Sequence, residues 1–188
     1  LTLERHTGRR PGRTHDGVVI ALRSNIRWCS DHFELACRNG EIVRVLFAID
    51  ACDREVMGWL ATSAGISGEM VRDLMIACVE RRFGISKAAH PVEWLSDNGS
   101  AYIAKDTLDT ATALGLKLCF TPVRSPESNG IAEAFVKTFK RDYAQLSILP
   151  DAETVIALLR AWFEDYNEVH PHSGLKFLSP REFLRLSA

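Results

Sequence analysis

The sequence lacks any hydrophobic run long enough to span a membrane, and its first residues lack the apolar stretch of a secretory signal peptide. It has no internal repeat and no excess of charge of one sign, since 23 Lys and Arg residues balance 24 Asp and Glu residues. These absences exclude a disordered tail, a coiled coil and a membrane span. They favour a globular protein whose 188 residues suffice to bury a core.

Paired metal-binding cysteines are also missing. The five cysteines are widely spaced and form no C-x-x-C pair, and the histidines offer one close pair, His170 and His172. Zinc sites need convergent Cys and His ligands at short spacing, so we expect no zinc site. Reduced, mostly buried thiols and a cytoplasmic location are expected instead. Because the first residue is not Met, we also expect a fragment of a longer protein.

The hydrophobic pattern predicts an α/β fold in which helices flank a five-stranded mixed sheet. The turn signal Asn39-Gly40 joins the first two of three closely spaced strands, which favours an antiparallel meander. A helix is expected between a Ser67 cap and Gly84, and strands and helices then alternate. The predicted strands cover residues 26–36, 41–50, 54–62, 92–96 and 116–121, and the later helices cover 104–114, 131–145 and 151–168.

The same pattern divides the chain into three segments. Residues 1–22 form a basic N-terminal extension, residues 23–147 form the core, and residues 148–188 form a C-terminal helical extension packed on that core. The extension is either a solvated tail or a nucleic-acid contact, because its arginines have almost no acids among them.

Three acids stand out by their positions. Strand alternation places Asp31 on the same face as Cys29 and Phe33, where a carboxylate is unfavourable unless it is paired or binds a cation. Asp97 directly follows a hydrophobic strand, at the kind of strand end where α/β folds place their sites. Glu133 lies near the start of a helix.

On that helix, Glu133, Lys137 and Lys140 fall within an arc of about 60°. This line of one acid and two cations suits a metal-binding end followed by a phosphate-contacting body. It also suits an ordinary Glu–Lys surface pair that supports the helix by a few tenths of a kcal/mol, and from the helix alone we favour that simpler interpretation.

The order of several motifs resembles the DDE transposases of bacterial insertion sequences, within the superfamily of the retroviral-integrase catalytic core. Asp97 is followed by Asn-Gly-Ser, and 35 residues separate it from Glu133. The similarity runs from about Arg23 to the C-terminus and includes Trp28-Cys-Ser-Asp31, Ala48-Ile-Asp-Ala-Cys-Asp-Arg-Glu55, Ser125-Pro-Glu-Ser-Asn-Gly130, Phe135-Val-Lys-Thr-Phe-Lys-Arg141 and Tyr166-Asn-Glu-Val-His-Pro-His172.

The resemblance implies a ribonuclease H-like fold with adjacent first and fourth strands, and DNA cleavage and strand transfer catalysed by Asp31, Asp97 and Glu133. These acids would bind Mg²⁺ or Mn²⁺, with two ions about 3.5–4 Å apart. Lys137, Lys140 and Arg141 would contact DNA. The implied partners are transposon ends, target DNA and further copies of this chain, in a bacterial cytoplasm with nucleoid association during the reaction.

Several alternatives remain open at this point. Asp50 and Asp53 compete with Asp31 for the first acidic position, with Asp50 as the fallback ligand. The Tyr166-Asn167 motif either docks the last helices or contacts DNA, and we favour docking. Two other kinds of protein compete with the transposase interpretation. They are a ribonuclease H-like nuclease and a non-catalytic DNA-binding relic of a mobile element. Residues 1–20 contain no helix-turn-helix pattern, so we expect a catalytic core without that sequence-reading module.

Overall fold

The computed structural model describes residues 21–121 and 129–187. The predicted basic N-terminal extension therefore lies almost entirely outside the described residues. The described part contains one five-stranded sheet with the strand order β3-β2-β1-β4-β5. Its strands are β1 (Arg27–Ala36), β2 (Ile42–Asp50), β3 (Val56–Thr62), β4 (Val92–Ser96) and β5 (Leu116–Phe120).

The first three strands form the predicted antiparallel meander, and β4 and β5 add to β1 in parallel. The hairpin between β1 and β2 turns at Gly40, whose φ of 91° is readily adopted only without a side chain. The Asn39 side chain accepts a hydrogen bond from the Glu41 amide across this turn. The sheet is thus ribonuclease H-like and mixed, with β1 at its centre.

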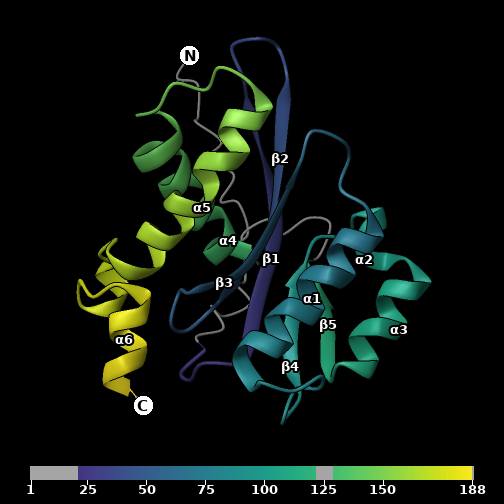
Figure 1. The fold of residues 1–188 in the computed structure, drawn as a ribbon. Coiled ribbons are helices and arrows are strands. Elements are labelled where there is room, and N and C mark those ends of the chain that lie inside the picture. Colours follow the sequence, from purple (N-terminus) through teal and green to yellow (C-terminus); the bar gives the residue numbers. More distant parts are fainter. Residues whose placement is uncertain (1–20, 122–128, 188) are drawn as a thin grey trace, which may run out of the picture.

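Helices cover both faces of the sheet (Figure 1). On one face, Trp28 and Trp94 pack beneath the helices, and all described helices between β3 and β5 lie on this side. These helices are α1 (Gly68–Phe83), α2 (Ser100–Ile103) and α3 (Lys105–Ala113). The Ser67 hydroxyl caps α1, and Gly84 ends it with a left-handed φ of 68°, both as predicted.

The opposite face is covered by helices from the C-terminal third of the chain (Figure 1). Phe135 and Phe139 of the first helix pack on Phe33, and Trp59 of β3 stacks on Phe163. The elements here are α4 (Gly130–Phe139), the π-helical turn η2 (Lys140–Ala144), α5 (Ala152–Glu168), the 3₁₀ turn η3 (Ser173–Leu175) and α6 (Pro180–Ser187).

Two of the sequence-predicted helices differ in detail. The helix expected over 131–145 is α-helical only to Phe139 and continues as a π-helical turn. The segment after Asp97 forms the short helix α2 before α3, and periodicity gave no sign of it because it has only four residues. All five cysteines are free thiols. Among the described residues, no helix is both long and apolar enough to cross a bilayer.

Candidate active site

Strand pairing brings Asp31 of the central strand β1 beside Asp97, at the carboxyl end of β4. In the parallel pair β1–β4, Trp28 lies opposite Trp94 and Cys29 lies opposite Leu95. Extending this register by two residues places Asp31 beside Asp97, which directly follows the last residue of β4. The carboxyl ends of parallel strands form the usual crevice for a site in such sheets. The fold therefore places two of the three predicted acids together.

Glu133 approaches these two acids from α4. The helix is fixed at its N-cap, where the buried Asn129 side chain donates a 3.4 Å hydrogen bond to the carbonyl of Ser30, the residue before Asp31. Further along, the Phe135 ring packs 4.5 Å from the ring of Phe47. These contacts hold the first turns of α4, which carry Glu133, against β1, which carries Asp31, and against its neighbour β2.

The charges of Asp97 and Glu133 act on Asp31. Burial raises the pKa of the Asp31 carboxyl, and the negative charges of Asp97 and Glu133 raise it further. The backbone N–H of His32 opposes this rise by donating a 2.7 Å hydrogen bond to Asp31 Oδ1. A carboxylate whose charge is disfavoured by burial and by two neighbouring acids is a group that a cation would stabilise.

The acids do not form a closed ligand cage on their own. In residues 21–121 and 129–187, no three His, Cys, Asp or Glu side chains converge closely enough to hold one metal ion. The exposed Asp97 carboxylate turns back on its own loop, where its Oδ1 accepts a 2.8 Å hydrogen bond from the Gly99 N–H. A Cβ at Gly99 would lie 2.9 Å from this oxygen, so the glycine makes room for the carboxylate.

A buried hydroxyl pair lies beneath this edge of the sheet, and sequence reasoning missed it. The Tyr102 hydroxyl of α2 lies 3.0 Å from Ser30 Oγ, and Ser30 Oγ donates to the carbonyl of Phe47 at 2.9 Å. Burial raises the pKa of Tyr102, and the charges of Asp31 and Asp97 raise it further. Tyr102 thus packs beneath the site and contacts Ser30, the residue before Asp31. Its position three residues after Gly99, in a helix too short for periodicity, gave no signal in the sequence.

The three predicted cations lie along α4 and the turn that follows it. Lys137 is exposed, and the Lys140 ammonium lies 5.8 Å from the centre of the Phe33 ring. Arg141 is held by Asp142, which accepts two hydrogen bonds from its guanidinium and whose Oδ2 lies 2.9 Å from His170 Nε2. The two lysines are therefore the more available of the three for an anionic partner.

The competing acids Asp50 and Asp53 have structural partners. Asp50 is fully buried and accepts hydrogen bonds from the indole of Trp28 and from the backbone N–H groups of Asn25, Cys52 and Asp53. Asp53 forms a two-pronged ion pair with Arg82 at 3.0 and 2.9 Å. These bonds fix the turn between β2 and β3, which accounts for both acids without a metal.

The Tyr166-Asn167 motif docks the C-terminal helices. The Asn167 amide is buried, accepts a hydrogen bond from the Val56 N–H at 2.9 Å and donates one to the Val56 carbonyl at 3.0 Å. The Tyr166 ring packs on Phe135 and lies stacked on His170. These contacts join α5 to the edge strand β3 and to α4.

A five-stranded ribonuclease H-like sheet with one acid within β1 and a second directly after β4 is typical of the class of integrase-type catalytic cores. The Integrase core domain family matches residues 21–126, and a second family of the same description matches residues 114–180. The chain belongs to the integrase core domain family, among the DDE transposases of bacterial insertion elements.

Two relatives agree with this membership. An insertion element IS136 protein of Agrobacterium fabrum is 59% identical, with 98% of this chain and 95% of that protein aligned. The IS2 transposase InsD of Escherichia coli is 53% identical, and this chain spans 100% of its own length but 63% of that protein.

The solved structures show the fold. A simian T-cell lymphotropic virus intasome chain superimposes with a TM-score of 0.69 at 14% identity, covering 89% of this chain and 56% of that one. The catalytic core domain of BIV integrase superimposes with a TM-score of 0.57 at 15% identity, covering 87% of this chain and 96% of that one.

Proposed function

We propose that this catalytic core cleaves DNA ends and joins them to target DNA by metal-dependent polynucleotidyl transfer, with Asp31, Asp97 and Glu133 as the catalytic acids. The observation that carries the proposal is the pairing of Asp31, within the central strand β1, with Asp97, directly after β4, by the register of the two strands. The charges of Asp97 and of Glu133 on α4 contribute to raising the pKa of Asp31. Acids gathered in this way are expected where divalent cations assist phosphoryl chemistry.

The proposed cofactor is Mg²⁺ or Mn²⁺, bound as two ions. The donor set consists of carboxylate oxygens alone, which suits hard cations, whereas zinc prefers nitrogen and sulfur ligands. Among the structural neighbours, the Mos1 transposase catalytic domain was solved with Mg and with Mn. When bound, the ions would activate a water or a 3′-hydroxyl and stabilise the leaving 3′-oxygen. Asp31 and Asp97 would hold them, with Glu133 completing the ligand set from α4.

DNA would lie along the lysine-bearing edge of α4. Lys137 and Lys140 follow Glu133 by one and two helical turns, so their ammonium groups would meet phosphates next to the cleaved bond. Arg141 is included in the proposed footprint, and its ion pair with Asp142 would have to loosen for it to reach a phosphate. Replacing either lysine with Ala should weaken DNA binding and reduce the salt slope of affinity by about 1.

The wider assembly follows from the same proposal. Residues 23–147 would act as the catalytic core, with residues 148–188 as a helical extension docked on it and residues 1–22 as a basic extension. The structurally similar chain of the simian T-cell lymphotropic virus comes from an intasome. We infer that the present chain likewise acts in an oligomer that pairs two DNA ends. Its partners would be transposon ends and target DNA, in the bacterial cytoplasm and at the nucleoid during the reaction.

The experiment compares Glu133→Gln and Asp97→Asn with the wild type in Mn²⁺-dependent nicking of supercoiled plasmid. Glu153→Gln is the matched control, because Glu153 also lies in the first turn of a helix, is exposed and belongs to α5. We expect both site variants to lose about 100-fold or more in nicking rate while DNA binding persists, and the control to match the wild type. A relic that only binds DNA would show no nicking in any variant. Wild-type nicking rates in both site variants would remove the catalytic assignment.

A further inference from the structure

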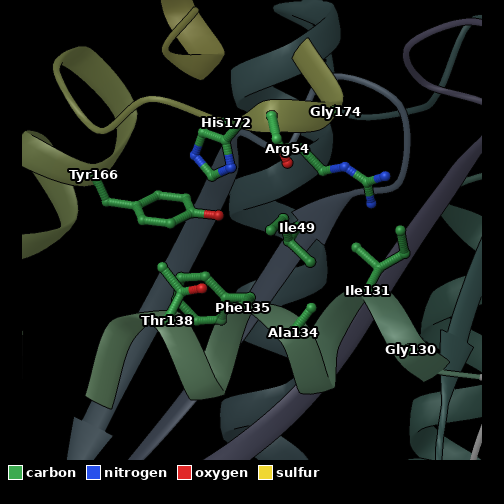
Figure 2. A pocket seen from close by; sticks show the side chains of 11 residues that line it. Ile49, Arg54, Gly130, Ile131, Ala134, Phe135, Thr138, Tyr166, His172 and Gly174 are labelled. Carbon is green, nitrogen blue, oxygen red and sulfur yellow. The ribbon is translucent and has the colours of Figure 1, made fainter. Parts of the chain in front are cut away.

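A pocket of about 320 Å³ lies against a different face of α4 from the one that carries Glu133 and Lys137 (Figure 2). It opens to solvent and is lined by residues of α4, of β2 and the turn that follows it, of the end of α5, and of η3 with the residue before it. None of the three proposed catalytic acids lines it. Its lining consists of Ile49, Arg54, Gly130, Ile131, Ala134, Phe135, Thr138, Tyr166, His172, Ser173 and Gly174.

The lining chemistry favours an anion. It contains one cation, Arg54, and no carboxylate. The hydroxyls of Thr138, Tyr166 and Ser173 add possible donors above a floor formed by Ile49 and Phe135. Figure 2 shows the Tyr166 hydroxyl directed into the cavity and the Arg54 side chain extending above the start of α4. A guanidinium beside hydroxyl donors, with apolar walls that limit water, suits an acceptor-rich oxyanion.

Arg54 is held in place by an unusual turn. Its backbone has a φ of 63°, which is unfavourable for a residue with a side chain. The buried carboxylates of Asp50 and Asp53 fix this turn by accepting backbone N–H groups, and Arg82 in turn fixes Asp53. These buried acids, which the catalytic proposal does not use, thus serve to present Arg54.

Arg54 is the charged side chain of the pocket lining. Within residues 21–121 and 129–187, its guanidinium forms no ion pair. Burial lowers the pKa of His172 to about 4, and the positive charges of His170 and Arg54 contribute to that decrease. His172 is therefore neutral at pH 7, and Arg54 is the charge that the pocket presents to a ligand.

We propose that this pocket is a binding site for a phosphate-class oxyanion, held by Arg54 together with the hydroxyls of Tyr166 and Thr138. The site is separate from the metal-binding edge and stands whether or not the catalytic proposal holds. Two sources carry this chemistry, namely a backbone phosphate of bound DNA and a free phosphate-bearing small molecule. The first would extend the DNA footprint across the start of α4, from the lysine edge to the pocket.

The test titrates the chain with inorganic phosphate at constant ionic strength and without divalent metal, and follows backbone amide NMR shifts of Gly130, Ser173 and Gly174. The informative variant is Arg54→Gly, since glycine adopts a positive φ without strain and the fold should persist. Tyr166→Phe removes one donor while keeping the ring. Arg38→Met, at an exposed cation near the β1–β2 turn, is the matched control.

We expect saturable shifts in the wild type, unchanged binding in Arg38→Met and phosphate binding weaker by about tenfold or more in Arg54→Gly. Non-saturating shifts in the wild type, or equal affinity in Arg54→Gly, would overturn the proposal. A short DNA duplex then identifies the source. Displacement of phosphate by DNA, with weaker DNA binding in Arg54→Gly, assigns the pocket to a DNA phosphate. Phosphate binding that DNA leaves undisturbed assigns it to a free phosphate compound.

Discussion

The substitution Asn167→Leu should strongly destabilise the fold, because it removes a two-way hydrogen-bonded pair between α5 and β3. Residues 167 and 56 lie 111 positions apart, and the Asn167 amide satisfies both the N–H and the carbonyl of Val56. The β2–β3 register shifts between Ala48 and Ile49, next to the pairing of Ile49 with Val56. The Val56 backbone therefore depends on the side chain of α5 at this irregular point of the ladder.

The magnitude follows from the groups left behind. Both residues are buried, so leucine would leave one N–H and one carbonyl without a partner, at about 1–3 kcal/mol each. Leucine has the same number of side-chain heavy atoms as asparagine and the same branching at Cγ, so the substitution opens no cavity. We therefore expect the free energy of unfolding to fall by about 2–6 kcal/mol.

Urea unfolding followed by tryptophan fluorescence measures this change. Arg160→Leu is the control, since Arg160 is exposed on the same helix and should change stability by less than about 0.5 kcal/mol. A loss of less than about 1 kcal/mol in Asn167→Leu would refute the docking role. If DNA affinity fell while stability stayed at the wild-type level, the motif would be a DNA contact instead.

Three further substitutions test other parts of the account. Gly99→Ala should leave the fold intact but displace the Asp97 carboxylate, because its Oδ1 would lie 2.9 Å from the new Cβ. The affinity for Mn²⁺, measured by calorimetry, should therefore fall. An unchanged affinity would speak against a role of Asp97 as a metal ligand. Arg82→Met should lower the free energy of unfolding by about 3–5 kcal/mol, because it leaves the buried Asp53 carboxylate unpaired. Adding Asp53→Asn should restore part of this loss. A double variant that is no more stable than Arg82→Met would contradict the ion-pair explanation. The folded-state pKa of His172 is lowered to about 4, so its contribution to stability is complete above about pH 6.5 and is lost as the pH falls towards 4. Between pH 7 and pH 4.5, the free energy of unfolding of His172→Gln should therefore fall by about 1–2 kcal/mol less than that of the wild type. Parallel pH profiles of the two proteins would show that the shift is absent.

The strands and the positions of Asp31 and Asp97 on them were predictable from the sequence because their signals are local. Alternation located β1, the Asn39-Gly40 turn predicted the first hairpin, and Asp97 directly follows the hydrophobic run of β4. The adjacency of β1 and β4 came from the family resemblance, and the strand order confirms it. The pairing of Asp31 with Asp97 then follows from register.

The supporting contacts were not predictable, since each depends on residues far apart in the sequence. Tyr102 reaches Ser30 across 72 positions, and Asn129 reaches the same residue across 99. Arg54 belongs to a motif that the sequence already suggested, but its left-handed backbone and its place in a pocket depend on the packing of α4 and α5. No local pattern encodes such contacts.

The central claim is that Asp31, Asp97 and Glu133 form one metal site, and anomalous scattering from manganese-soaked crystals tests it most directly. We expect anomalous peaks between the Asp31 and Asp97 carboxylates, with Glu133 of α4 drawn to the same ions. Manganese ordered at Asp50 and Asp53, with none at Asp31 and Asp97, would contradict it and would move the first acidic position to the turn after β2.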